Sequence, residues 1–93
     1  MKNININAFI TESPFYLHTL PSKLHAKKQV IQLLAQQLYT DAVFTEKEIT
    51  ETISTVCNNP VDIRRYLIDF KFMERTQDGS RYQFLHENIY CEL

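Results

Sequence analysis

The stretch Asp62-Ile-Arg-Arg-Tyr-Leu-Ile-Asp69 decides the fold, because it has the pattern of a short amphipathic helix. Three of its residues share one apolar side of a helical wheel with Phe70, which follows the stretch: Ile63, Tyr66 and Leu67. Asn59-Pro60, just before the stretch, supplies an N-cap followed by proline at the first helical position. We therefore predict a helix over about residues 59–71 whose apolar side packs on a core.

A turn signal, Asp78-Gly79, follows this helix and predicts a β-hairpin with a type I′ turn. The two strands span roughly residues 72–76 and 80–84. Their register pairs Met73 with Phe84, Arg75 with Tyr82, and Thr76 with Arg81. In this register the aliphatic stem of Arg75 covers its neighbours on the same face of the hairpin. We therefore expect Arg75 to have a structural role.

Two further helices precede these elements. The stronger one covers about residues 22–39, with Ser22 as the expected N-cap and a broad apolar stripe: Leu24, Val30, Ile31, Leu34 and Leu38. A short strand is expected at residues 42–44. Thr45 then begins the other helix, with Glu48 at the spacing of a capping box. The order helix, strand, helix, helix, hairpin predicts a winged helix-turn-helix, a mainly α fold with a small β-hairpin (α+β).

The chain of 93 residues is long enough for one domain with a modest core, so we predict a single domain over residues 1–93. Its winged-helix core spans residues 22–85. Residues 1–21 form an N-terminal segment that packs on this core and begins with a short helix ending before Ser13. Residues 86–93 form a C-terminal tail, whose apolar side chains either close the core or make a homodimer or partner surface.

Several motifs form a pattern that is specific in combination: Leu20-Pro21, Phe44-Thr45-Glu46-Lys47-Glu48-Ile49, Asp62-Ile63-Arg64-Arg65-Tyr66-Leu67-Ile68-Asp69, Arg75 and Gly79-Ser80-Arg81-Tyr82. With this pattern the chain resembles the DUF2087 family, a domain of uncharacterised function. Members of that family resemble winged-helix regulators, and some carry the domain beside a separate DNA-binding module. The resemblance therefore implies a winged-helix fold and a role connected with transcription. Thr50 and Gln83 depart from the pattern, at positions where Asn and an aromatic residue are common.

The charge of the chain is nearly balanced, at −1 with a pI near 6.3, so there is no global attraction to a polyanion. The balance differs along the chain. Residues 1–43 carry +2, residues 44–84 carry −1, and residues 85–93 carry −2. If the second half of the domain binds DNA, it must do so with locally arranged charge.

The third helix and the hairpin are the parts of a winged helix that usually meet DNA. Four basic residues are the predicted contacts with double-stranded DNA: Arg64 and Arg65 from the helix, Arg81 from the wing, and Lys47 on a phosphate. Backbone amides at the starts of the second and third helices are further candidates for phosphate binding. Arg65 has an alternative role, because Asp62 and Asp69 lie at the spacing of intrahelical ion pairs. Arg64 and Arg81 are therefore the preferred contacts.

We expect no catalytic, metal or cofactor site. The three histidines lack a Cys or acidic partner at the spacing of a nucleophilic or zinc site. Cys57 and Cys91 have no CxxC spacing, and neither a signal peptide nor a membrane span is visible, so reduced thiols in a cytoplasmic protein are expected. The alternative to DNA binding is a non-enzymatic protein-interaction or dimerisation module with the same fold.

Overall fold

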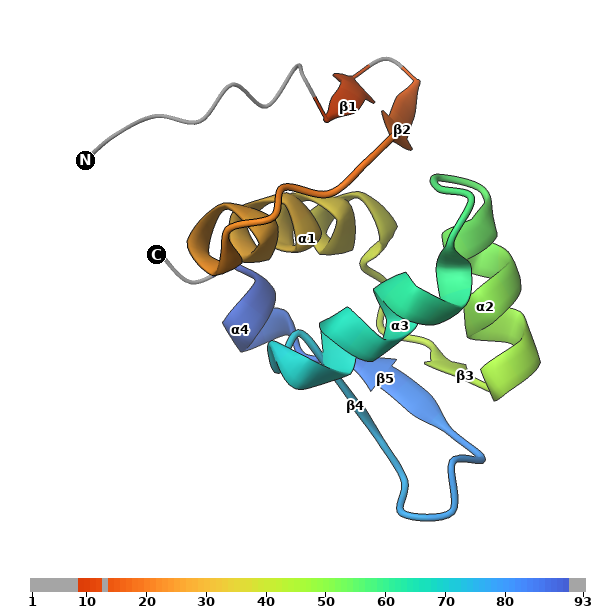
Figure 1. The fold of residues 1–93 in the computed structure, drawn as a ribbon. Helices are drawn as coiled ribbons and strands as arrows, with labels where there is room; N and C mark the ends of the chain where they lie inside the picture. Colours follow the sequence, from red (N-terminus) through yellow and green to blue (C-terminus); the bar gives the residue numbers. More distant parts are fainter. Residues whose placement is uncertain (1–8, 13, 91–93) are drawn as a thin grey trace.

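A computed structural model of the chain describes residues 9–12 and 14–90 (Figure 1). Its elements follow in this order: β1 (Ile10–Glu12), β2 (Phe15–Leu17), α1 (Leu24–Leu38), β3 (Val43–Phe44), α2 (Glu46–Ser54), α3 (Pro60–Asp69), β4 (Met73–Arg75), β5 (Tyr82–Phe84) and α4 (His86–Ile89). From α1 to β5 this is the predicted order of elements. The fold is confirmed as an α+β winged helix, in which α1, α2 and α3 pack together and the hairpin β4–β5 projects from them.

The long helix α1 is held by packing rather than by a cap. Its buried side carries the residues Val30, Ile31, Leu34 and Ala35, all fully buried, as expected for an apolar stripe. The predicted stripe is wrong at Leu24, which lies in the first turn and is 69% exposed. The predicted N-cap, Ser22, is wrong. Lys23 occupies the cap position and makes no side-chain hydrogen bond to the helix. The stripe therefore stabilises α1 without help from its first turn.

The start of α2 confirms the predicted capping box. Thr45 N donates to Glu48 Oε1 at 2.9 Å, and Glu48 N donates to Thr45 Oγ1 at 3.1 Å, so two amides that the helix leaves unpaired are satisfied. Ile49 and Ile53 then point into the core and are fully buried. These interactions fix the direction in which α2 leaves the short strand β3.

Helix α3 begins at Pro60 as predicted, although Asn59 makes no side-chain capping bond. It ends earlier than expected, at Asp69, because Lys71 has a left-handed backbone with φ of 67°. Lys71 N donates to Ile68 O at 3.1 Å and Phe72 N to Leu67 O at 2.9 Å, the two hydrogen bonds of a Schellman motif. The motif turns the chain sharply from α3 into β4.

The hairpin has the predicted register, with Met73 opposite Phe84 and Arg75 opposite Tyr82. The short strand β3 pairs with the other side of β5, so the sheet order is β3-β5-β4. The predicted type I′ turn is wrong. That turn needs positive φ at two residues, and in this loop only Gly79, with φ of 75°, has it. A wider loop closes instead, in which Gly79 N donates to Thr76 O at 2.9 Å.

The N-terminal segment forms a hairpin of β1 and β2 and not the predicted helix. The predicted helix is wrong over residues 10–12, and residues 1–8 lie outside the described part of the chain. Ile10 pairs with Leu17, and both side chains are buried. Leu17 N also donates to Val56 O at 2.7 Å, so pairing with a distant segment overrides the local helical pattern. Ile10 and Leu17 of this hairpin thus join the buried apolar cluster.

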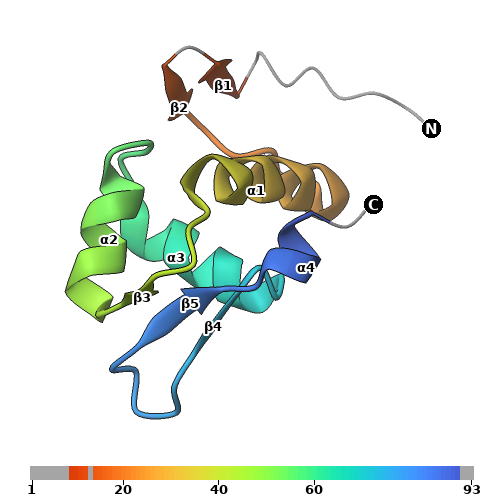
Figure 2. The same ribbon diagram turned by 180° about the vertical axis from the view of Figure 1, so that it is seen from behind.

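The tail contains a short helix, α4, which closes the core against α1 (Figure 2). Ile89 is fully buried. Its carbonyl accepts hydrogen bonds from Gln32 Nε2 at 2.7 Å and from Gln36 Nε2 at 3.2 Å. Of the two predicted roles for apolar residues in the tail, Ile89 has the first, closure of the core.

Candidate nucleic-acid interface

The start of α2, the outward side of α3 and the tip of the hairpin meet at a shallow groove of about 610 Å³. We call it the interface groove. These residues line it: Thr45, Glu46, Lys47, Thr50, Glu51, Val61, Arg64, Gly79 and Ser80. The groove lies where a winged helix would meet DNA, between its recognition helix and its wing. It includes two of the four predicted contacts, Lys47 and Arg64.

The two sides of α3 are divided as the helical wheel predicted. Ile63 and Leu67 are buried, whereas Asp62, Arg65 and Asp69 are exposed. The alternative role of Arg65 is not realised. Within the part of the chain that the structure describes, its guanidinium makes no ion pair or hydrogen bond. An exposed ion pair at this spacing contributes only a few tenths of a kcal/mol, which is too little to hold a long side chain in place. Arg65 therefore projects freely from α3.

Arg64 is held in place by contacts with other side chains of the protein. Its Nη1 donates to Thr50 Oγ1 at 2.6 Å, its Nη2 lies 3.3 Å from Glu46 Oε2, and its side chain is only 17% exposed. The guanidinium carbon also lies 5.5 Å from the centre of the Tyr82 ring, a cation–π arrangement. Arg64 thus connects α3 to α2 and to β5. Its predicted contact with DNA stays a prediction, and that contact would have to replace some of these interactions.

Thr50 is the partner that the sequence pattern did not identify. Its position is one of the two departures from the family pattern, where Asn is common. A threonine hydroxyl and an asparagine carbonyl both accept a hydrogen bond. The substitution therefore keeps an acceptor for Arg64. This explains why the departure leaves the junction between α2 and α3 intact.

The two arginines of the hairpin lie on opposite faces. Arg75 faces Tyr82 across the strands, on the side of the hairpin that packs towards α3, and its Nη1 donates to Thr76 O at 3.4 Å. Arg81 lines a pocket on the outer face of the sheet together with Val43 and Gln83. The structure thus does not bring Arg81 into the interface groove. Its predicted DNA contact would have to come from the outer side of the wing.

Charges of both signs line the groove. Lys47 and Arg64 are balanced by Glu46 and Glu51. Lys47 is exposed and makes no ion pair with any described residue. The amides of Thr45 and Glu48 are used by the capping box, and the first residue of α3 is a proline without an amide hydrogen. Among the residues that the structure describes, the free cation of the groove is therefore Lys47, whereas Arg65 lies on the exposed side of α3 outside the groove lining.

Metal-ligating side chains, the buried cysteine and the lengths of the helices can also be described for residues 9–12 and 14–90. No group of three or more His, Cys, Asp or Glu side chains there is placed to hold a metal ion. Burial raises the pKa of the Cys57 thiol, which disfavours the reactive thiolate. Cys91 lies outside the described residues. No helix in the described ranges is long and apolar enough to cross a membrane.

Comparison with curated proteins and with solved structures found no match to this chain. A family model does match, over residues 16–84, which is about three quarters of the chain. That family is described as an uncharacterized protein conserved in bacteria, DUF2087. The match begins in β2, runs through the three helices of the winged helix and ends with β5. The chain therefore belongs to the DUF2087 family.

Proposed function

We propose that this domain binds double-stranded DNA, as a bacterial transcriptional regulator or as an accessory domain of one. Helix α3 enters the major groove, and the hairpin β4–β5 lies alongside as the wing. One observation carries the proposal. Arg65 projects from the exposed side of α3 without a partner among the described residues, at the centre of the face that a recognition helix presents to base edges.

Each of the other cations has a separate task in this proposal. Lys47 binds a phosphate beside α2. Arg64 remains a structural connection in the free protein and exchanges Glu46 for a phosphate on binding. The exchange costs little because Glu46 is 59% exposed, and an ion pair open to solvent contributes about 0–1 kcal/mol. Arg81 contacts the backbone of a neighbouring segment from the outer side of the wing.

The proposal predicts modest affinity with a marked dependence on salt. Neutralising about three phosphates gives a slope of log K against log salt near −3, by the usual value of about −0.9 per phosphate on B-DNA. Asp62 and Asp69, the acidic residues of α3, also weaken non-specific DNA binding because they repel phosphates. Specific sequences should therefore be selected at low salt.

Binding of the full chain to a pool of random duplexes at low salt tests the proposal. We expect the Arg65→Ala variant to bind about five- to 150-fold more weakly, since a base-contacting arginine contributes about 1–3 kcal/mol. Lys23→Ala is the matched control, because Lys23 is an exposed cation at the start of α1, far from α3 in sequence. Binding that is insensitive to salt, or equal in the two variants, would contradict the proposal.

A second function is favoured by the charge balance of the interface groove. Two acidic residues offset two basic ones there, and Val61 is 51% exposed beside them. These features suit a protein partner or a second copy of the chain better than a polyanion. If the domain binds a second copy of itself, the same assay shows no salt-dependent DNA binding. Sedimentation equilibrium then gives the mass of a dimer for the unchanged chain and the mass of a monomer for Val61→Ser.

A further inference from the structure

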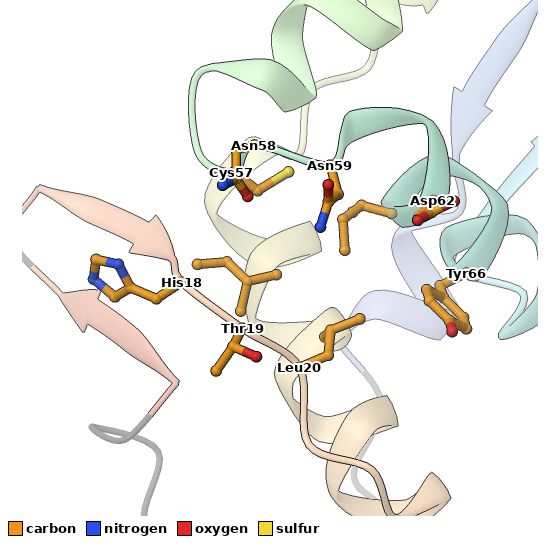
Figure 3. A pocket seen from close by; sticks show the side chains of 10 residues that line it. His18, Thr19, Leu20, Cys57, Asn58, Asn59, Asp62 and Tyr66 are labelled. Carbon is orange, nitrogen blue, oxygen red and sulfur yellow. The ribbon is translucent and has the colours of Figure 1, made fainter.

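A second pocket, of about 160 Å³, lies between the N-terminal segment and the start of α3 (Figure 3). Residues 17–20 form one wall, the turn at residues 57–59 forms another, and Asp62, Ile63 and Tyr66 of α3 complete it. It shares no lining residue with the interface groove. Because its walls come from two segments far apart in sequence, a molecule bound here would hold the N-terminal segment against α3.

The floor of this pocket is apolar, although polar atoms make up the larger part of the pocket's whole surface. Leu17 and Ile63 are buried, and Leu20 and the Tyr66 ring are half-buried beside them. An apolar cavity of about 150 Å³ is large enough to hold a benzene ring. A single aromatic ring therefore matches the volume of the pocket and the apolar side chains of its floor.

The rim of the pocket is polar and carries unused hydrogen-bonding groups. Asn59 stands at the N-cap of α3, yet its side chain makes no capping bond and points towards the segment at residues 18–20 (Figure 3). Asp62 makes no ion pair with any described residue. The ring of His18 points away, where its Nε2 lies 2.6 Å from Thr11 Oγ1. The Asn59 amide and the Asp62 carboxylate are thus among the polar groups of the lining that a ligand could engage.

The charge of the lining selects the sign of the ligand. Asp62 is its one carboxylate, and the lining contains neither lysine nor arginine. Lys27 of α1 contacts the lining residue Tyr66: its Nζ lies 3.4 Å from the hydroxyl and 4.9 Å from the ring centre. A ligand with a positive charge is therefore favoured over an anion.

We infer that this pocket binds a small organic amine that has one aromatic ring. The ring lies against Leu17, Leu20 and Ile63, and the ammonium group donates hydrogen bonds to the Asp62 carboxylate and the Asn59 amide oxygen. Binding stabilises the folded chain by mass action, because the pocket exists only when the N-terminal segment is packed on α3.

Titration of the full chain with benzylamine, followed by amide NMR shifts, tests the inference. We expect saturable shifts at residues 17–20 and 57–66, with a dissociation constant in the millimolar range for so small a probe. Asp62→Asn should weaken binding about two- to fivefold, the effect of losing one solvent-accessible ion pair. Asp69→Asn is the matched control, since it removes a carboxylate from the same helix outside the pocket.

Three results would overturn the inference. The first is the absence of saturable shifts at the two walls. The second is equal weakening by Asp62→Asn and Asp69→Asn. The third is binding of benzyl alcohol, the neutral analogue, as tightly as benzylamine, which would remove the role of the charge.

Discussion

Lys71 has a backbone conformation that normally belongs to glycine. Its φ of 67° is required by the Schellman motif that ends α3, and an L-residue in that conformation costs about 1–2 kcal/mol. The turn is maintained by tertiary contacts: Phe72, the next residue, is buried, and Asn88 Nδ2 donates to Lys71 O at 2.6 Å. Packing of the two flanking segments thus holds a strained residue in place.

We therefore expect Lys71→Gly to stabilise the domain by about 0.5–1 kcal/mol. The released backbone strain stabilises the folded state, and the greater conformational entropy of glycine in the unfolded chain offsets part of that gain. Urea denaturation measures the difference. Lys71→Ala is the control, because it removes the same charge and stem but keeps the strained φ. A glycine variant no more stable than the alanine variant would show that Lys71 is not strained.

Arg64 and Arg65 show which contacts of a side chain can be predicted from the sequence and which cannot. The spacing of Arg65 from Asp62 and Asp69 is visible in the sequence, but the partners of Arg64 are not. Thr50 and Glu46 lie one helix away, and they meet Arg64 only after α2 has packed on α3. The structure thus engages Arg64 and not Arg65, and the preference for Arg64 as the DNA contact stays a prediction. Local spacing describes one helix and not its neighbour.

Among the elements, those with strong local signals were predicted best. The capping box placed α2, and centring the hairpin on Asp78-Gly79 gave the register of β4 and β5. The hairpin β1–β2 was missed because it depends on contacts with the distant Val56. The turn type was missed because side-chain hydrogen bonds, rather than Asp78-Gly79 alone, determine the loop.

The loop of the wing is organised by the Asp78 carboxylate. Its Oδ1 accepts hydrogen bonds from Thr76 Oγ1 and Ser80 Oγ, both at 2.8 Å, and from Ser80 N at 3.0 Å. These bonds, with the Thr76 hydroxyl as the largest contribution, lower the pKa of Asp78 from 3.8 to about 2. Because the folded-state pKa is depressed, the ionised Asp78 stabilises the loop above about pH 4. That contribution is lost as the pH falls through about 2.

Replacing the hydroxyl tests this account of the wing. In Thr76→Val we expect the pKa of Asp78 to rise towards 3.8, because the strongest hydrogen bond to the carboxylate is gone. Thr76→Ser keeps the hydroxyl and should leave the pKa low. NMR titration of the Asp78 carboxyl carbon measures both variants. Equal pKa values in the two would show that the backbone and Ser80 alone organise the loop.

At the scale of the whole molecule, the two ends of the chain complete the core of the winged helix. The hairpin β1–β2 brings Ile10 and Leu17 onto the core, and α4 brings Ile89. The sequence showed that both ends are apolar, but it left open what they cover. In the structure α4 contacts α1, whereas Leu17 of β2 pairs with the segment between α2 and α3. The protein therefore uses more than its three central helices to complete its core.

The contribution of α4 to this core is large enough to measure. Ile89 is fully buried, and two glutamines of α1 hold its carbonyl, so the site cannot collapse easily when the side chain is shortened. We expect Ile89→Ala to destabilise the domain by about 2–5 kcal/mol, the usual range for a buried isoleucine. Glu87→Ala, an exposed change in the same helix, should shift stability by no more than about 0.5 kcal/mol. Urea denaturation with an unchanged m-value compares the two. A loss below about 1 kcal/mol for Ile89→Ala would mean that α4 only covers a core that is already complete.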